Sequence, residues 1–309
     1  MSHLNLQPGQ TAVITGAASG FGLELARLGA QKGLNLVLTD VQQDALDKVV
    51  AELTAAGAQV AALRGDVSRG EDIQALADLC LERFGVPHIV INNAGVAYGG
   101  LIWEAGPRDW EWVLGVNLWG VIHGVRVFTP LMLAEARKNP AYQGHIVNVA
   151  SMAGMLNSPN LGVYNVSKHA VVSLSETLYQ DLALVTDQVH ASVLCPYFVP
   201  TGIHQSHRNR PAELLTDAKP TASQLIGQAM SAKAVTSGKV TATDTAALVF
   251  NAIEANQFYV YTHPKAIGMV QVRMEDVMQA RNPTDPFAGK PEIGEQLKTA
   301  LRDALAKED

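Results

Sequence analysis

The chain has 309 residues, of which 48% are hydrophobic and 17% are charged, a composition typical of globular proteins. Its 23 basic and 29 acidic residues give a net charge of −6 without any basic block, which argues against nucleic acid or a membrane as a partner. Two cysteines, Cys80 and Cys195, and the absence of long apolar runs or a signal-peptide pattern predict a cytoplasmic protein without disulfides.

Short apolar, β-branched runs alternate with longer helical patterns from the start of the chain. Strands are predicted at residues 11–15, 35–39, 58–63, 88–92, 145–150, 190–194 and 258–262. Helical patterns fill the intervals, for example at residues 22–32, 43–56, 70–84 and 163–185. Because strands that alternate with helices assemble through right-handed βαβ units, the sequence predicts an α/β fold with a doubly wound parallel sheet.

Two segments interrupt this alternation. Residues 204–240 mix polar residues with Pro and Gly and contain two weak helical patterns, which favours a lid over a binding site. After Pro264 the sequence predicts a helix at about 265–280, a breaker-rich run at 281–291 and a final polar helix. We therefore predict one domain over residues 1–263 that includes the lid, followed by a helical C-terminal extension at 264–309.

The first predicted strand leads into the sequence TGAASGFG, a glycine-rich strand-to-helix turn. Gly16 permits the tight turn, Gly20 lets the backbone approach a ligand, and Gly22 lets the helix pack closely on the sheet. The start of that helix offers free N–H groups and a positive dipole end to a pyrophosphate. Ordinary βα turns can show the same spacing, so the glycines alone do not identify a ligand.

Asp40 ends the second predicted strand, close to where an acid would bind the ribose hydroxyls of a dinucleotide. The same carboxylate could instead cap the helix that follows it. The glycine turn and Asp40 together favour a dinucleotide ligand. A carboxylate would repel a 2′-phosphate, which favours NAD over NADP unless Arg64 or a mobile lysine offsets the repulsion.

The sequence YNVSK places Tyr164 and Lys168 four residues apart, on one face of a predicted helix. A tyrosine ionises at about pH 10, and a nearby ammonium would favour the phenolate that can take a proton from an alcohol. Ser151 ends the fifth predicted strand and could donate a hydrogen bond to a substrate oxygen. Taken alone, a pair such as Tyr164 and Lys168 is more often a surface pair, and a serine such as Ser151 is more often a turn residue.

Together with NNAG at residues 92–95 and GVNLWG at 115–120, these motifs resemble the short-chain dehydrogenase/reductase (SDR) family over residues 8–263. The resemblance implies a Rossmann fold that binds NAD, or alternatively NADP, and interconverts a secondary alcohol and a ketone by hydride transfer. It implies that Tyr164 is the general acid/base and that Lys168 lowers its pKa and binds the nicotinamide ribose. It also implies that Ser151 orients the carbonyl and that Asn117 anchors a water linked to Lys168.

The resemblance also implies the residues that contact the cofactor. Asp66 and Val67 would flank the adenine, and Val199 and Thr201 would hold the carboxamide. The full predicted set is Gly16, Ser19, Gly20, Phe21, Gly22, Asp40, Asp66, Val67, Asn93, Ala94, Gly95, Tyr164, Lys168, Pro196, Val199 and Thr201. NADP-dependent members usually carry a cation at the positions of Ser19 or Val41, and neither residue is charged here.

The substrate is less defined by these motifs. Tyr197 stands where the family usually has a glycine after Pro196, and it could narrow the pocket. FYVYTHP and the tail resemble bacterial members that oxidise bulky or aromatic secondary alcohols, including Cα-dehydrogenases of lignin-derived aryl ethers. We therefore expect a bulky, apolar or aromatic small-molecule substrate, with Tyr197 and Trp103 as candidate contacts. The family resemblance further implies a homodimer or homotetramer.

Two alternatives remain open at this point. A non-catalytic dinucleotide-binding regulator would keep the glycine turn but has no need of Ser151, Tyr164 and Lys168 together. A sugar epimerase or dehydratase would share the catalytic pair, although its C-terminal sugar domain is usually larger than the tail of this chain. The nearest pair of histidines, His204 and His207, lacks a third ligand, so no metal site is predicted.

Overall fold

A computed structural model describes residues 5–216 and 218–306 of the chain. Seven strands form one sheet in the order β3-β2-β1-β4-β5-β6-β7, and every neighbouring pair is parallel. The strands are β1 (Thr11–Thr15), β2 (Asn35–Asp40), β3 (Val60–Arg64), β4 (Ile89–Asn92), β5 (Gly144–Val149), β6 (Val189–Cys195) and β7 (Tyr259–Tyr261). The predicted doubly wound parallel sheet of the Rossmann type is confirmed, with β3, β4 and β7 shorter than predicted.

Ten α-helices lie within the described residues. They are α1 (Gly20–Gln31), α2 (Gln43–Ala55), α3 (Gly70–Phe84), α4 (Pro107–Leu114), α5 (Gly120–Lys138), α6 (Gly162–Val185), α7 (Ala222–Thr236), α8 (Ala242–Glu254), α9 (Ile267–Met278) and α10 (Pro291–Leu305). The four helices given as examples from the sequence are present, and their ends differ from the predictions by two residues or fewer.

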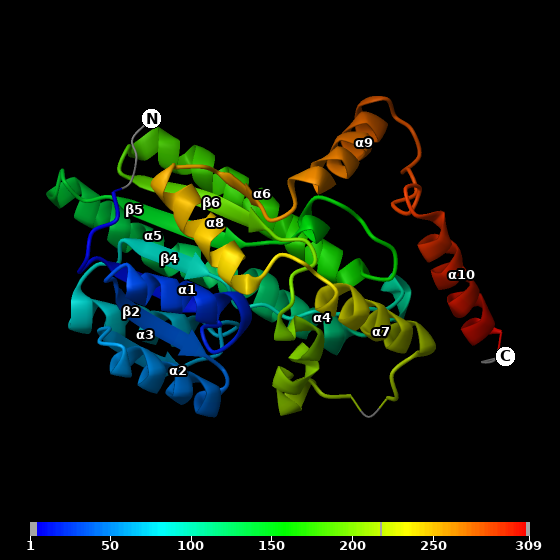
Figure 1. Ribbon diagram of the computed structural model, residues 1–309, viewed down its shortest axis with the longest axis horizontal. Helices are drawn as coiled ribbons and strands as arrows, with labels where there is room; N and C mark the ends of the chain where they lie inside the picture. The colour runs from blue at the N-terminus through cyan, green and yellow to red at the C-terminus, as the bar shows by residue number, and fades with distance from the viewer. Residues whose placement is uncertain (1–4, 217, 307–309) are drawn as a thin grey trace.

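Helices cover both faces of the sheet (Figure 1). On one face Ile14 packs in a core with residues of α1, α2 and α8, among them Leu25 and Phe250. Val13, which precedes Ile14 on β1, points to the opposite face. It packs with residues of α3, α5 and α6, among them Phe128. Because neighbouring strand residues are buried on opposite faces, the strand sequences are apolar almost throughout.

Helices α4 and α5 form one continuous helix, Pro107–Lys138, through the π-helical turn η2 (Gly115–Trp119). By length and composition this helix could cross a membrane, with a mean hydropathy of 1.2 over its most apolar window. Its apolar residues have a partner in the structure, since Phe128 and Met132 are fully buried in the core beneath α5. The helix therefore packs on the sheet through these residues, and 33% of its most apolar window is buried.

The strand order reverses between β1 and β4, which opens a crevice at the carboxyl ends of these strands. The two loops that leave the strands here are tied together by side chains. Thr15 Oγ1 accepts hydrogen bonds from the backbone N–H groups of Asn93 (2.9 Å) and Ala94 (3.1 Å). Asn93 Nδ2 donates to the carbonyl of Thr15 at 2.8 Å, which fixes the floor of the crevice.

The lid begins slightly earlier than predicted, at Gly202, and contains the 3-10 helices η4 (Gly202–Asn209) and η5 (Ala212–Leu214) before α7. In the tail, α9 packs through Val270 onto a cluster that includes Val171 of α6. The last helix, predicted as polar, buries Leu297 and packs against the lid helix α7. Helices α9 and α10 stand at one end of the molecule (Figure 1), and the division at residue 263 remains a prediction.

Candidate active site

The glycine turn after β1 has a backbone conformation and close contacts that exclude residues with a Cβ atom. Gly16 has a φ of +63°, and a Cβ there would lie 2.8 Å from Cα of Ala94. A Cβ at Gly22 would lie 2.1 Å from the carbonyl oxygen of Gly16, so the start of α1 packs directly on the turn. This close packing leaves the N-terminus of α1, at Gly20, open toward the crevice, as a bound pyrophosphate requires.

A cavity of about 600 Å³ extends from this turn to the start of α6. Predicted residues that line it are Gly16, Ser19, Gly20, Phe21, Asp40, Asp66, Val67, Asn93, Ala94, Gly95, Tyr164, Lys168, Pro196 and Thr201. Gly22 and Val199 are not part of the wall, since Gly22 packs behind the turn and Val199 is buried. The residues present thus fit a dinucleotide along the whole crevice.

The wall also contains residues that the sequence motifs did not identify. Val41 and Gln42 line the cavity directly after Asp40, where the neighbouring acid could have indicated them. Ile203 and Arg208 reach it from the lid, and no motif in the sequence marks them.

Asp40 is not the N-cap of α2, which is Gln42, and its contact with a ribose stays a prediction. Its Oδ2 accepts a hydrogen bond from the backbone of Ala18 at 3.0 Å, and its Oδ1 accepts one from Gln42 at 3.0 Å. The carboxylate therefore supports both the glycine turn and the approach to α2, while still lining the cavity. Arg64 does not line it, because its Nε donates to the carbonyl of Val41 at 3.0 Å.

Tyr164 and Lys168 line the inner end of the cavity, and Ser151 lies beside Tyr164 without lining the wall. Lys168 is buried, its Nζ lies 5.8 Å from the ring centroid of Tyr164, and it donates to the carbonyl of Val149 at 2.9 Å. Ser151 Oγ hydrogen bonds with Tyr164 and accepts a hydrogen bond from the backbone of Ala153 at 3.1 Å. The structure thus brings the predicted catalytic groups into one site.

Burial sets the ionisation of this pair. Burial raises the pKa of Tyr164, and the hydrogen bond with Ser151 opposes that rise. Burial lowers the pKa of Lys168 to about 8. In the protein alone Lys168 donates to the Val149 carbonyl, and the expected lowering of the Tyr164 pKa by Lys168 stays a prediction.

Asn117 sits in the π-helical turn between α4 and α5, a feature often found at functional sites. Its Oδ1 accepts from the backbone N–H of Val96 at 2.8 Å, and its Nδ2 donates to the Val96 carbonyl and to Ser167 Oγ, both at 3.0 Å. This side chain is buried, and these hydrogen bonds fix its orientation. The role of Asn117 in anchoring a water linked to Lys168 remains a prediction.

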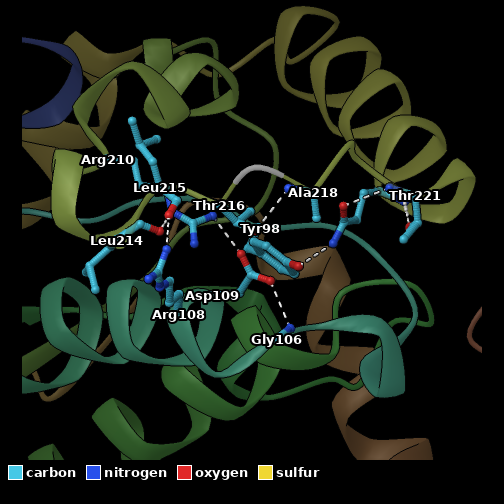
Figure 2. Close-up of polar contacts among 11 residues, drawn as sticks. Tyr98, Gly106, Arg108, Asp109, Arg210, Leu214, Leu215, Thr216, Ala218 and Thr221 are labelled. Carbon is cyan, nitrogen blue, oxygen red and sulfur yellow. Dashed lines mark hydrogen bonds and ion pairs between the residues drawn. The ribbon is translucent and has the colours of Figure 1, made fainter.

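The lid is fastened to α4 and to the segment before it (Figure 2). Arg210 Nη1 lies 2.6 Å from Asp109 Oδ1, in an ion pair that is largely removed from solvent. Arg108 donates to the carbonyl of Leu215, and Glu104 accepts from the hydroxyls of Thr221 and Ser223.

These contacts border a second cavity of about 700 Å³, separated from the first by Trp112 and Ser206, which line both.

Several sequence-based candidates lie elsewhere. Tyr197 packs against Phe198, with ring centroids 4.2 Å apart, and Trp103 is 74% exposed; neither lines these two cavities. His204 and His207 line the second cavity, and no cluster of three or more potential metal ligands occurs among the described residues. Cys80 and Cys195 are free, buried thiols, as expected.

Comparisons with known proteins agree with this site. Residues 10–212 match the family model described as short chain dehydrogenase. A "CLA biosynthesis dehydrogenase/reductase" of Lactiplantibacillus plantarum is 33% identical over 86% of this chain and 92% of its own. A "C alpha-dehydrogenase" of Sphingobium sp. is 30% identical over 94% of this chain and 92% of its own.

A solved short-chain dehydrogenase/reductase from Burkholderia phymatum, in complex with NAD, is 52% identical and superimposes with a TM-score of 0.89. The match covers 92% of this chain and 99% of that one. Sequence motifs, sheet order and relatives point to the same conclusion. This chain belongs to the short-chain dehydrogenase family of oxidoreductases.

Proposed function

We propose that this protein is an NAD-dependent dehydrogenase that interconverts a bulky secondary alcohol and its ketone. The observation that carries the proposal is that Tyr164 and buried Lys168, with Ser151 beside Tyr164, lie at one end of a cavity whose other end holds the glycine turn and Asp40. A protein that only bound a dinucleotide would have no use for a hydrogen-bonded tyrosine and serine beside a buried ammonium.

The chain's own groups handle the proton in this reaction. A bound NAD supplies the acceptor for the hydride. The Ser151 hydroxyl donates a hydrogen bond to the substrate oxygen, and Tyr164, as the phenolate, takes the proton of that oxygen when an alcohol is oxidised. Lys168, whose pKa burial lowers to about 8, can exchange a proton near neutral pH, which suits it to relay the proton away from the site.

Two features support NAD over NADP. The Asp40 carboxylate lines the cavity, and a 2′-phosphate beside it would place like charges close together. Arg64 is held on the Val41 carbonyl outside the cavity wall. The test is kcat/KM for both cofactors: we expect NAD to be preferred and Asp40→Ala to weaken NAD use and relax the preference. An NADP value equal to or above the NAD value contradicts this assignment.

A bulky substrate is supported by the second cavity beneath the lid and by the resemblance of the tail to Cα-dehydrogenases. Charged residues line part of that cavity, but most of its exposed wall is apolar, which supports a bulky and largely apolar substrate. Exposed apolar residues at the end of α6, Leu184 and Val185, are consistent with a homodimer or homotetramer. A cytoplasmic location completes the proposal.

The direct test is to incubate the purified protein with NAD and a panel of secondary alcohols and to follow NADH absorbance. We expect turnover that favours aryl-substituted or polycyclic alcohols over small ones at equal concentration. A regulator would bind NAD without turnover, and an epimerase would convert substrate without net NADH. Either result contradicts the proposal.

A further inference from the structure

Arg208 lies on the lid, facing the glycine turn across the cofactor cavity, and the mechanism above gives it no role. A Cβ built on Gly202 would lie 3.5 Å from Nη2 of Arg208. A Cβ built on Gly20, the first residue of α1, would lie 3.4 Å from Cβ of Thr201. The N-terminus of α1, the Thr201–Gly202 backbone and the Arg208 guanidinium are therefore successive neighbours along one stretch of the cavity wall.

The lid is anchored on either side of Arg208. Ser206 Oγ accepts a hydrogen bond from the backbone of Ala97 at 2.9 Å, and Arg210 pairs with Asp109 at 2.6 Å. Arg208 lies between these two anchors and lines the cofactor cavity, whereas Arg210 lines the second cavity. The anchored lid therefore presents the Arg208 side chain on its cofactor side.

The charges around the cavity leave Arg208 available for an anion. The other cations of the wall are occupied, since Arg69 pairs with Glu71 at 2.8 Å and Lys168 donates to the Val149 carbonyl. Arg208 Nη1 contacts only an amide oxygen, Oε1 of Gln205, at 3.0 Å, and no ion pair found among the described residues includes it. Carboxylates also line this cavity, at Asp40, Asp66, Glu111 and Glu213, so a dianionic ligand needs a cation.

Some backbone N–H groups of the glycine turn already donate hydrogen bonds within the protein. The backbone N–H of Ala17 donates to the Thr39 carbonyl, and that of Ala18 donates to Asp40. These two N–H groups are therefore not free to bind a pyrophosphate.

We propose that Arg208 binds the pyrophosphate of the dinucleotide from the lid, opposite the N-terminus of α1. A planar guanidinium suits phosphate oxygens because it can donate two parallel hydrogen bonds. Binding of the cofactor then holds the lid over the crevice through this one side chain. The inference rests on the dinucleotide ligand of the proposed function and is independent of its substrate.

The test separates the phosphate contact from the rest of the cofactor. Isothermal titration measures the affinities of NAD, ADP and adenosine for the wild type, for Arg208→Gln and for Arg69→Gln. Losing a charge-assisted hydrogen bond should weaken NAD and ADP about tenfold in Arg208→Gln, while adenosine changes by less than about twofold. Arg69→Gln removes the same charge from the same cavity wall and should leave ADP binding nearly unchanged.

Hydrogen exchange of lid residues 202–215 gives a second readout. ADP should slow exchange in the wild type and not in Arg208→Gln, and adenosine should slow it in neither. The proposal is overturned if Arg208→Gln leaves ADP affinity unchanged, weakens all three ligands equally, or matches Arg69→Gln. Failure of the wild type to bind NAD or ADP would instead contradict the proposed function itself.

Discussion

The crevice at the ends of β1 and β4 and the lid that covers it are built in different ways. In the crevice, contacts join the motif residues to one another: Thr15 accepts from Asn93, and Asp40 accepts from Ala18. In the lid, each fastening contact joins segments about a hundred residues apart, as between Asp109 and Arg210.

This difference explains why short sequence motifs predict the crevice and do not predict the contacts of the lid. It also separates their expected responses to mutation. Changes in the crevice should remove chemistry or cofactor binding outright, whereas changes in the lid should alter its local stability while the sheet persists.

The largest effect is expected at the inner end of the crevice. Tyr164→Phe removes only the hydroxyl that exchanges the proton, so kcat should fall about 10²- to 10⁴-fold while the dissociation constant for NAD stays nearly unchanged. Steady-state kinetics and titration of NAD check this. Retention of activity within about tenfold would remove Tyr164 from the role of general acid/base.

The same substitution made in both regions tests the comparison directly. A Cβ at Gly22 would lie 2.1 Å from the carbonyl oxygen of Gly16, whereas a Cβ at Gly268 of α9 would meet nothing within 4 Å. We expect Gly22→Ala to lower the free energy of unfolding by about 1–3 kcal/mol and to weaken NAD binding. Gly268→Ala should be neutral or stabilise by up to about 1 kcal/mol.

Urea denaturation and NAD titration measure both variants of this pair. Equal effects of the two substitutions would show that the glycine turn is no more tightly constrained than the tail, contrary to the geometry.

Breaking the ion pair between Asp109 and Arg210 should act on the lid alone. Arg210→Gln leaves a largely buried carboxylate without its cation, so amides of residues 202–215 should exchange about tenfold faster. The melting temperature should change little, because the pair lies outside the sheet core. Lys298→Gln, which removes an exposed pair with Glu295 on α10, is the control and should leave lid exchange unchanged.

The sequence predicted what depends on local chemistry. Gly16 and Asp40 could be placed because their residue types and their positions at strand ends carry the reason for their roles. The pairing of Asp109 with Arg210 could not be predicted, since no periodicity links two charges 101 residues apart.

Two features of the site were missed for related reasons. The π-helical turn at Asn117 has no pattern in the helix sequence that marks it, and it arises from bonds to Val96 and Ser167. The raised pKa of Tyr164 depends on burial, which a motif does not report.

The smallest expected effect concerns the sheet far from both regions. His145, at the amino end of β5, is fully buried beside Ser192, and burial lowers its pKa from 6.5 to about 3. In the unfolded chain His145 binds a proton below about pH 6.5, whereas in the folded chain it binds one only below about pH 3. Stability from this group is therefore complete above that range and is lost as the pH falls, by about 1 kcal/mol between pH 8 and pH 6.

Urea unfolding of the wild type and of His145→Asn at pH 8 and pH 6 measures this contribution as the difference between their pH dependences. Each variant is compared with itself, so a constant loss of stability in His145→Asn does not affect the result. His190 lies 6.3 Å away and its pKa is also lowered by burial, so the slope should shrink in His145→Asn without vanishing. His207→Asn, at an exposed lid position, should keep the wild-type slope. If His145→Asn also keeps the wild-type slope, the buried neutral His145 does not contribute to the pH dependence of the free energy of unfolding.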